Sequence, residues 1–331
     1  TPNGGKPSSA VSIKCSAVAP TLERTRTHEA QGCYGYQPMN ILVLGRNGQL
    51  GQCLQDVLPR VYPNAVFWGR QQLDLEQLEG IEPRLSAQQP DVIINASAYT
   101  AVDQAETNSA LAYTVNQHAV AQVADYCAKN DVALLHVSTD YVFDGSSQRP
   151  YAETAEPNPS SVYGASKLAG EKAIAASGCR HVILRTAWVF SEHGQNFFKT
   201  MLRLGGERDT LRIVGDQIGC PTYARDLAFA LISVLKRVEN GTCSWGLYHY
   251  AGGRDVSWFE FAEAIFAAAA DIGLTVPKHV MAITTEEYPT PAPRPAWSVL
   301  DSSLFTHAFG HPASNWQTAI EACLRALNQP S

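Results

Sequence analysis

The stretch that decides the fold is Met39-Asn-Ile-Leu-Val-Leu-Gly-Arg-Asn-Gly-Gln-Leu-Gly51. Its apolar run, Ile41–Leu44, predicts a buried parallel strand, because strands covered on both faces are continuously apolar. Glycines follow at positions 45, 48 and 51, and the residues from 48 to 58 predict a helix. Glycine permits a tight turn and lets backbone N–H groups approach a phosphate at the positive end of a helix. Strand, glycine turn and helix in this order predict a dinucleotide-binding site.

Strands and helices continue to alternate as far as about residue 190. Further strands are expected at 65–68, 92–94, 132–137 and 181–184, with helices between them, including a long one from about 109 to 129. This alternation predicts an α/β fold, a Rossmann-type doubly wound parallel sheet with right-handed crossovers. We assign 39–190 to a dinucleotide-binding domain, to which some later segments return.

The regular alternation ends near Trp188. Helices are expected at 196–204, 224–238 and 258–270, mixed with short strands and the proline-rich loop 288–295. This pattern predicts a smaller mixed α/β lobe, residues 191–331, that mainly binds the substrate and closes over it. Residues 1–38 show no sustained apolar period and are left out of the fold. They are interpreted as a leader added upstream of Met39 or as an organelle transit peptide.

The composition argues against several other classes of protein. With 45% hydrophobic and 17% charged residues, the chain of 331 residues resembles an ordinary globular protein. Its net charge of −6 argues against a nucleic-acid or anionic-membrane partner, and no apolar run is long enough to span a bilayer. The eight cysteines show no CxxC pairing, which favours reduced thiols and a cytoplasmic location over disulfides or a zinc site.

The segment Tyr163-Gly-Ala-Ser-Lys167 offers a proton donor. Tyrosine and lysine four residues apart share one face of a helix, and a nearby ammonium lowers the pKa of a phenol from about 10. Tyr163 is thus a candidate general acid for a carbonyl oxygen. Thr139 follows the fourth strand, where its hydroxyl could bond the same oxygen or simply stabilise a turn. The histidines at 118, 136 and 193 show no partner pattern and are expected to have no catalytic part.

The residues after the second strand bear on the choice of dinucleotide. Gly69-Arg70 stands where an NAD-specific enzyme places an acid for the ribose 2′-hydroxyl. Arg70 would meet a 2′-phosphate, which favours NADPH over NADH; the alternative is a solvated loop charge. Asp74 would meet the adenine amino group or cap the next helix. Asn116, inside the long expected helix, would hold Lys167 through backbone or water contacts.

Six motifs resemble those of the dTDP-4-dehydrorhamnose reductases, a family of extended short-chain dehydrogenase/reductases. Three lie in the first half: Asn95-Ala-Ser-Ala-Tyr-Thr-Ala-Val-Asp103, Ser138-Thr-Asp-Tyr-Val-Phe-Asp-Gly145 and Val162-Tyr-Gly-Ala-Ser-Lys-Leu-Ala-Gly-Glu171. Three lie in or border the expected substrate lobe: Arg185-Thr-Ala-Trp-Val189, Asp216-Gln-Ile-Gly-Cys-Pro-Thr222 and Arg294-Pro-Ala-Trp-Ser298. The likeness runs from Met39 to the C-terminal helix.

The resemblance implies reduction of the C4 ketone of dTDP-6-deoxy-L-lyxo-4-hexulose (dTDP-4-dehydrorhamnose) to dTDP-L-rhamnose, with NADPH or, in some members, NADH. Tyr163 would protonate the C4 oxygen, Thr139 would orient the carbonyl, and Lys167 would hold the nicotinamide ribose. The cofactor would be bound by Gly45, Asn47, Gly48, Gln49, Leu50, Gly51, Arg70, Asp74, Leu75, Ala96, Ser97, Ala98, Asn116, Tyr163 and Lys167. The dTDP-sugar would be bound by Thr100, Val102, Thr139, Tyr141, Tyr163, Trp188 and Arg294.

The chain departs from the family pattern at one point. Some members dimerise through a metal held by acidic residues, one of them soon after the third glycine. Here that neighbourhood reads Gly51-Gln52-Cys53, and Glu207 alone matches the other half of such a site. We therefore expect no required metal, and either a monomer or a homodimer.

Two other functions remain open. One is a non-catalytic NADP-binding regulatory subunit, which would resemble the β subunit of methionine adenosyltransferase. Thr139 and the segment Ala98–Asp103 count against it. The other is a sugar-nucleotide epimerase or dehydratase. A dehydratase would carry a second acid after Asp140, where this chain has Tyr141.

Overall fold

The computed structural model describes residues 39–328, so the expected leader, residues 1–38, lies outside the described residues. The main sheet consists of β1 (Ile41–Leu44), β2 (Val66–Trp68), β3 (Val92–Asn95), β4 (Ala133–Thr139), β5 (His181–Thr186) and β10 (Gly246–His249). Its strands are parallel and lie in the order β10-β5-β4-β3-β1-β2. The chain passes from β1 to β2 on one side and from β3 to β5 on the other. The sheet is therefore doubly wound, and the predicted Rossmann-type fold is confirmed.

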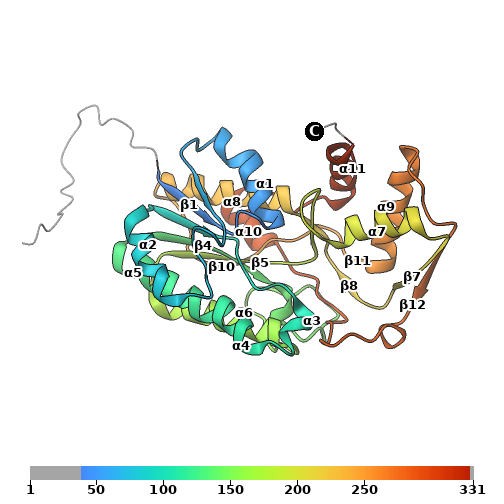
Figure 1. Ribbon diagram of the computed structural model, residues 1–331, viewed down its shortest axis with the longest axis horizontal. Helices are drawn as coiled ribbons and strands as arrows, with labels where there is room; N and C mark the ends of the chain where they lie inside the picture. The colour runs from blue at the N-terminus through green and yellow to red at the C-terminus, as the bar shows by residue number, and fades with distance from the viewer. Residues whose placement is uncertain (1–38, 329–331) are drawn as a thin grey trace, which may run out of the picture. The chain divides into compact units, whose positions relative to one another are not determined.

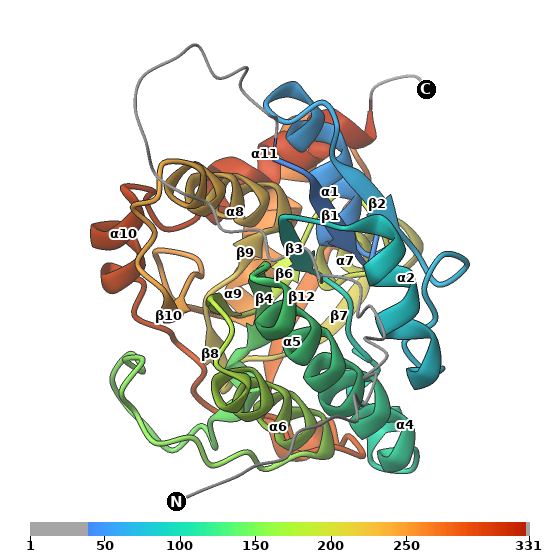
Figure 2. The ribbon, with the colours of Figure 1, turned by 90° about the vertical axis from the view of Figure 1, so that its left-hand side faces the viewer.

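Helices cover both faces of this sheet (Figures 1 and 2). One face packs against α1 (Gln49–Val57), α8 (Ala224–Glu239) and α10 (Ser303–Phe309), and the other against α2 (Ile81–Gln88), α5 (Ala119–Asn130) and α6 (Val162–Ser177). Residues of β1 alternate between the two cores, Ile41 and Val43 in one and Leu42 and Leu44 in the other. Burial on both faces explains why this strand is apolar throughout.

The long helix expected from about 109 to 129 is interrupted. It consists of α4 (Ser109–Tyr113), a π-helical turn at Thr114–His118, and α5, and it follows the short α3 (Val102–Ala105). The π turn lies against α6, where a Cβ added at Gly170 would stand 2.2 Å from the carbonyl oxygen of Asn116. Glycine at that position therefore permits the close approach of the two helices.

Apart from α8, β10 and α10, the chain beyond Trp188 forms a second group of elements (Figure 1). Helices α7 (Phe197–Glu207), α9 (Trp258–Asp271) and α11 (Trp316–Leu327) enclose a separate apolar core. Three two-stranded sheets accompany them: β7 (Thr210–Val214) with β12 (His279–Ile283), β8 (Ile218–Gly219) with β11 (Val256–Ser257), and β6 (Val189–Phe190) with β9 (Thr222–Tyr223). Within residues 39–328, no helix combines the length and the apolar character that crossing a bilayer requires.

Candidate active site

A cavity of about 1040 Å³ lies at the carboxyl ends of the strands of the main sheet. Leu44, Trp68, Thr139 and Thr186 stand at the ends of β1, β2, β4 and β5, and Ala96 follows β3; all five line its wall. This edge includes the point between β1 and β3 where the strand order reverses, which is where doubly wound sheets bind ligands.

The cavity brings together most of the residues that the sequence singles out. These are Gly45, Asn47, Gly48, Gln49, Leu50, Arg70, Asp74, Leu75, Ala96, Ser97, Ala98, Thr100, Val102, Thr139, Tyr141, Tyr163, Lys167 and Trp188. Gly51, Asn116 and Arg294 do not line it.

The glycines let the turn pack closely against its neighbours and bring the start of α1 to the cavity. Gly45 has φ +93°, and a Cβ there would lie 2.7 Å from the carbonyl oxygen of Ala96. Gly51 acts through packing, since its Cβ would lie 2.1 Å from the carbonyl oxygen of Gly45. Helix α1 starts after Gly48, with no side-chain cap and no acid in its first turn. Its first N–H groups and the positive end of its dipole are thus free to meet an anion.

Arg70 lies at the outer part of the cavity wall and is already paired. Its side chain is 71% exposed and donates to Glu76 Oε1 at 2.6 Å, and its Nε stands 3.9 Å from Asp74 Oδ1. Asp74 accepts the backbone N–H of Glu76 at 3.1 Å, so it stabilises the turn after the second strand. The guanidinium is therefore placed beside the cavity but shared with an acid.

Tyr163 and Thr139 meet where α6 approaches the end of β4. Ser161 caps α6 by accepting the N–H of Gly164, and a Cβ at Gly164 would lie 2.1 Å from the carbonyl oxygen of Tyr141. This close contact brings the Tyr163 phenol to the Thr139 hydroxyl. Burial raises the pKa of Tyr163 to about 12, although the Thr139 hydroxyl opposes the shift.

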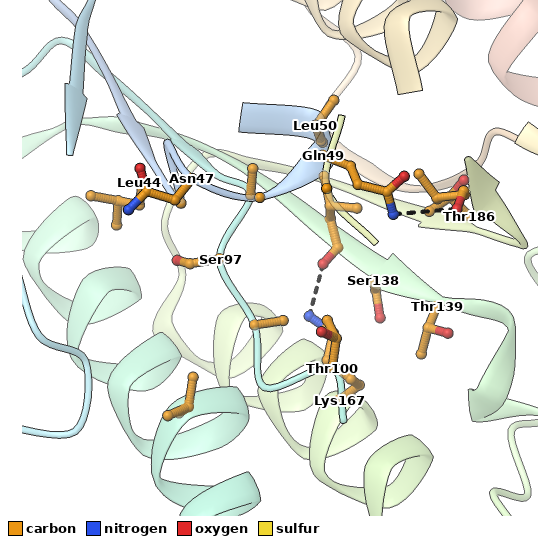
Figure 3. A pocket seen from close by; sticks show the side chains of 18 of the residues that line it. Leu44, Asn47, Gln49, Leu50, Ser97, Thr100, Ser138, Thr139, Lys167 and Thr186 are labelled. Carbon is orange, nitrogen blue, oxygen red and sulfur yellow. Dashed lines mark hydrogen bonds between the residues drawn. The ribbon is translucent and has the colours of Figure 1, made fainter. Parts of the chain in front are cut away.

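The expected lowering of the pKa of Tyr163 by Lys167 is therefore not found. Lys167 is buried, and its Nζ donates to the carbonyl oxygen of Val137 at 2.8 Å and lies 3.2 Å from His136 Nε2. Figure 3 shows Lys167 reaching from its helix toward the sheet, close to Thr139 and Ser138. Burial lowers the pKa of Lys167 to about 8, against the attraction of Glu171.

The contact between His136 and Lys167 was not predicted from the sequence. Its ring lies between Lys167 and Asn95, with Nδ1 at 3.2 Å from the Asn95 amide nitrogen. Burial lowers the pKa of His136 well below its usual value, and the nearby Lys167 adds to this effect. The alternation of β4 offers a signal, because residues 134, 136 and 138 share the face on which α6 packs.

The Asn116 side chain does not contact Lys167, and the expected contact through backbone or water stays a prediction. Its amide accepts the N–H of Tyr99 at 2.9 Å and donates to the carbonyl oxygen of Tyr99 and to the hydroxyl of Ser166. All of its polar atoms are thus committed to fixing the segment after β3 against α6. Asn116 positions the wall of the cavity but is not part of it.

Two residues expected at the substrate have other partners. Arg294 donates to Asp103 Oδ1 at 2.9 Å and lies over the Tyr141 ring, 5.9 Å from its centroid. Trp188 lines the cavity with an unusual φ of +47° and stacks on Trp258, with the ring centroids 3.4 Å apart. Arg294 therefore fixes the loop behind Tyr141, while the two indoles form an apolar wall.

Part of the cavity wall was not predicted from the sequence. Trp258 and the loop Gly194–Phe197 come from the second group of elements and close the cavity opposite the main sheet. A local signal does place Trp258 at a helix start, because Ser257 and Glu260 form a capping box. Nothing local indicates that this helix start faces a cavity.

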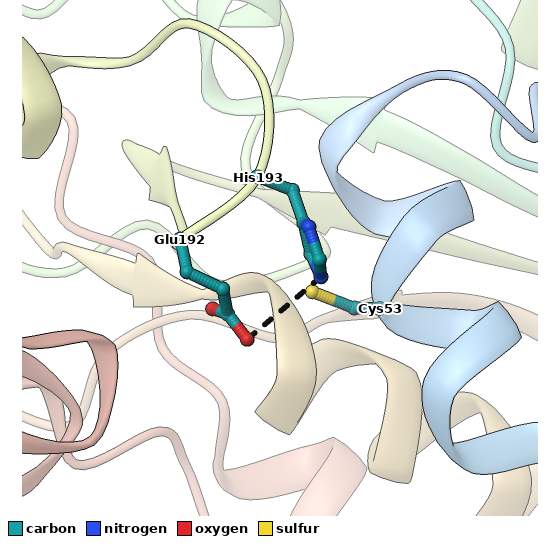
Figure 4. Close-up of side chains that lie close together, drawn as sticks. All are labelled: Cys53, Glu192 and His193. Atoms are coloured by element: carbon teal, nitrogen blue, oxygen red, sulfur yellow. Dashed lines mark ion pairs between the residues drawn. The ribbon is translucent and has the colours of Figure 1, made fainter. Parts of the chain in front are cut away.

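A cluster of charged side chains lies beside α1 (Figure 4). Ligand atoms of Cys53, Glu192 and His193 lie within 4.8 Å of one another. Arg225 donates to both Glu192 and Asp56, and His193 Nε2 lies 2.9 Å from Asp56 Oδ2. Burial raises the pKa of Cys53 to about 12, so it is a thiol and not the thiolate that binds metals. The guanidinium already balances both carboxylates, and the cluster is an ion-pair network joining α1 to α8.

Comparison with known proteins agrees with this geometry. A family model described as the RmlD substrate binding domain matches residues 39–329. The dTDP-4-dehydrorhamnose reductase of Aggregatibacter actinomycetemcomitans is 44% identical over 287 residues, which cover 85% of this chain and 97% of that protein.

Solved structures agree as well. The crystal structure of a dTDP-4-dehydrorhamnose reductase from Clostridium acetobutylicum aligns with a TM-score of 0.81 and 34% identity, covering 88% of this chain and 100% of that one. The Bacillus anthracis enzyme, solved in complex with NADP, gives a TM-score of 0.80 and 33% identity over 88% and 100% of the two chains. The chain belongs to the dTDP-4-dehydrorhamnose reductase family.

Proposed function

We propose that this chain reduces the C4 ketone of dTDP-4-dehydrorhamnose to dTDP-L-rhamnose, with NADPH as the preferred reductant and NADH as the alternative. The observation that carries the proposal is that Thr139, Tyr163 and Lys167 line the same cavity as the glycine turn before α1. The names of the relatives supply the substrate.

The residues present fit a dinucleotide. A Cβ at Gly45 or Gly51 would collide with backbone, so glycine at both positions lets the turn bring the start of α1 to the cavity, where it would meet a pyrophosphate. Arg70 would meet a 2′-phosphate, and the residues Ala96–Ala98 would lie along the cofactor. When bound, NADPH supplies the hydride for the carbonyl carbon.

Tyr163 is the general acid in this proposal. Because its pKa is raised to about 12, the phenol is fully protonated at neutral pH and can give its proton to the C4 oxygen. Lys167 lies one turn further along α6, where its ammonium would hold the nicotinamide ribose. Thr139 provides a second hydroxyl for the same oxygen, which orients the ketone.

Oxidation of NADPH, followed at 340 nm with dTDP-4-dehydrorhamnose, tests the assignment. We expect turnover in the wild type and a loss of about 10²–10⁴-fold in Tyr163→Phe, because the variant lacks only the acidic oxygen. Binding of NADPH should stay near normal. Tyr288→Phe is the matched control, because Tyr288 is 61% exposed and does not line the cavity.

Near wild-type turnover in Tyr163→Phe would rule out this acid. Absence of turnover in the wild type, with NADPH still bound, would instead favour the regulatory-subunit alternative.

A further inference from the structure

Asp140 is a buried carboxyl in the cavity wall that the mechanism above does not use. It follows Thr139 directly, is only 2% exposed and contributes to the lining of the cavity. Its Oδ1 accepts the Thr139 hydroxyl at 2.9 Å. Its Oδ2 is buried and has no hydrogen-bond partner among the residues that the structure describes. Burying an ionised carboxylate that has an oxygen without a hydrogen-bond partner costs free energy.

The protonation state of Asp140 decides which hydrogen bonds the Thr139 hydroxyl can make. A threonine hydroxyl has one proton to donate and two lone pairs. The N–H of Tyr141 takes one lone pair at 3.2 Å. The Tyr163 phenol also neighbours this hydroxyl, but in the proposed mechanism its O–H points to the ketone. One proton and one lone pair of Thr139 then remain for Asp140 and the oxygen of the substrate.

A ketone oxygen carries no proton, so it can only accept. If Asp140 is a carboxylate, it takes the single Thr139 proton, and Thr139 then presents only a lone pair to the ketone. If Asp140 is protonated, its O–H fills the remaining lone pair, and the Thr139 proton is free for the ketone. Thr139 can orient a ketone only in the second arrangement.

We propose that Asp140 is a positioning residue that sets the direction of the Thr139 hydrogen bond, and that its protonated form is the one that binds and reduces the ketone. The inference rests on the proposed function. The Asp140 proton is neither consumed nor released: Tyr163 supplies the proton that the C4 oxygen gains.

The surroundings of Asp140 allow this switch near neutral pH. Burial raises the pKa of Asp140 to about 7. The titratable groups facing it are the phenols of Tyr141 and Tyr163 and the thiol of Cys220, and burial raises the pKa of all three, to about 12 for Tyr163 and Cys220. These groups stay neutral across the range in which Asp140 titrates. Lys167, with a pKa lowered to about 8, is the other group of the site that titrates there.

The pH dependence of ketone reduction tests the inference. The wild-type kcat/KM should fall about tenfold per pH unit above a midpoint near pH 7 as Asp140 ionises. In Asp140→Asn the amide can always donate to Thr139, so the fall in kcat/KM near pH 7 should vanish. Only the fall at higher pH, from the titration of Lys167, should remain. Asp125→Asn, an exposed carboxylate on α5, should keep the wild-type profile.

A second variant covers the case in which Asp140→Asn fails to fold. Thr139→Ala removes the group through which Asp140 acts, so its lower activity should show no such fall near pH 7. If the fall in kcat/KM near pH 7 persists in either variant, the inference is wrong. It is also wrong if a folded, NADPH-binding Asp140→Asn protein is inactive at pH 6, because asparagine mimics the donor.

Failure of the proposed function has a different signature. In that case the wild type oxidises no NADPH at any pH, and the inference falls with it. Failure of the inference alone shows as normal turnover in the wild type, with the fall in kcat/KM near pH 7 still present in the variants.

Discussion

Arg70 is the residue on which we expect the choice between NADPH and NADH to depend. Its guanidinium lines the cavity, is largely exposed and is paired with Glu76. An exposed ion pair contributes at most about 1 kcal/mol, whereas hydrogen bonds to a charged group contribute about 1.5–3 kcal/mol. A 2′-phosphate is therefore expected to compete successfully with Glu76 for this guanidinium.

Arg70→Ala should raise the Kd of NADPH about tenfold or more and leave the Kd of NADH unchanged, because only NADPH carries the 2′-phosphate. Fluorescence titration with each cofactor measures both constants. Arg60→Ala is the control, since Arg60 is exposed and does not line the cavity. An equal rise in the Kd of NADPH and of NADH would mean that Arg70 does not bind the 2′-phosphate.

Helix α1 and the glycine turn before it act as one element. The turn keeps its shape because no Cβ stands between Gly51 and the carbonyl group of Gly45. The helix start can then approach the end of β1, with its N–H groups toward the cavity. A single methyl group is enough to test how tightly this arrangement is packed.

Gly51→Ala should lower the free energy of unfolding by about 1–3 kcal/mol, because the new Cβ is overpacked against the carbonyl of Gly45. It should also weaken NADPH and NADH alike. Gly206→Ala, in α7, has nothing within 4 Å of its Cβ and should instead raise stability by about 0.5–1 kcal/mol. Denaturant unfolding and cofactor titration measure both effects. Unchanged affinity in Gly51→Ala would mean that the turn does not hold the cofactor.

Elements with a local signal are predictable from this sequence, and elements defined by distant partners are not. The apolar run of β1 and the helical period of α1 are read directly from adjacent residues. The strand β10 has no such signal; it is a strand because its four residues pair with the free edge of β5. The π turn at Thr114–His118 is likewise invisible to a helical period, since it depends on packing against α6.

The same division applies to the site. Thr139, Tyr163 and Lys167 are predictable because strand ends and helix faces follow from spacing. The Lys167–His136 contact and the burial of Asp140 are not, because both arise from how closely α6 packs on the end of β4. The raised pKa of Tyr163 follows from the same packing.

At the scale of the whole molecule, segments from late in the sequence return to the core that the early segments form. Helix α8, strand β10 and helix α10 come from beyond residue 190, yet they pack with β1 and α1 in one core. β10 also pairs with β5 along four residues. The expected division into a dinucleotide-binding part and a substrate-binding part stays a prediction, and no single cut in the sequence separates the two cores.

A fragment of residues 39–190 should therefore not fold cooperatively, because it lacks α8 and α10, two of the three helices over one face of its sheet, and the strand at one edge. Thermal unfolding followed by circular dichroism should show a broad transition, with weak or absent NADPH binding. The full chain is the control. A sharp transition and wild-type NADPH affinity in the fragment would contradict this expectation.

The late return of β10 also matters while the protein is being made. About sixty residues separate the end of β5 from the start of β10, which a ribosome takes several seconds to synthesise. During that time the nascent chain exposes the apolar edge of β5, which can pair with a neighbouring chain on the same messenger. Chaperone demand should consequently peak midway through translation, and a pause in synthesis between these two strands would raise the yield of aggregated protein.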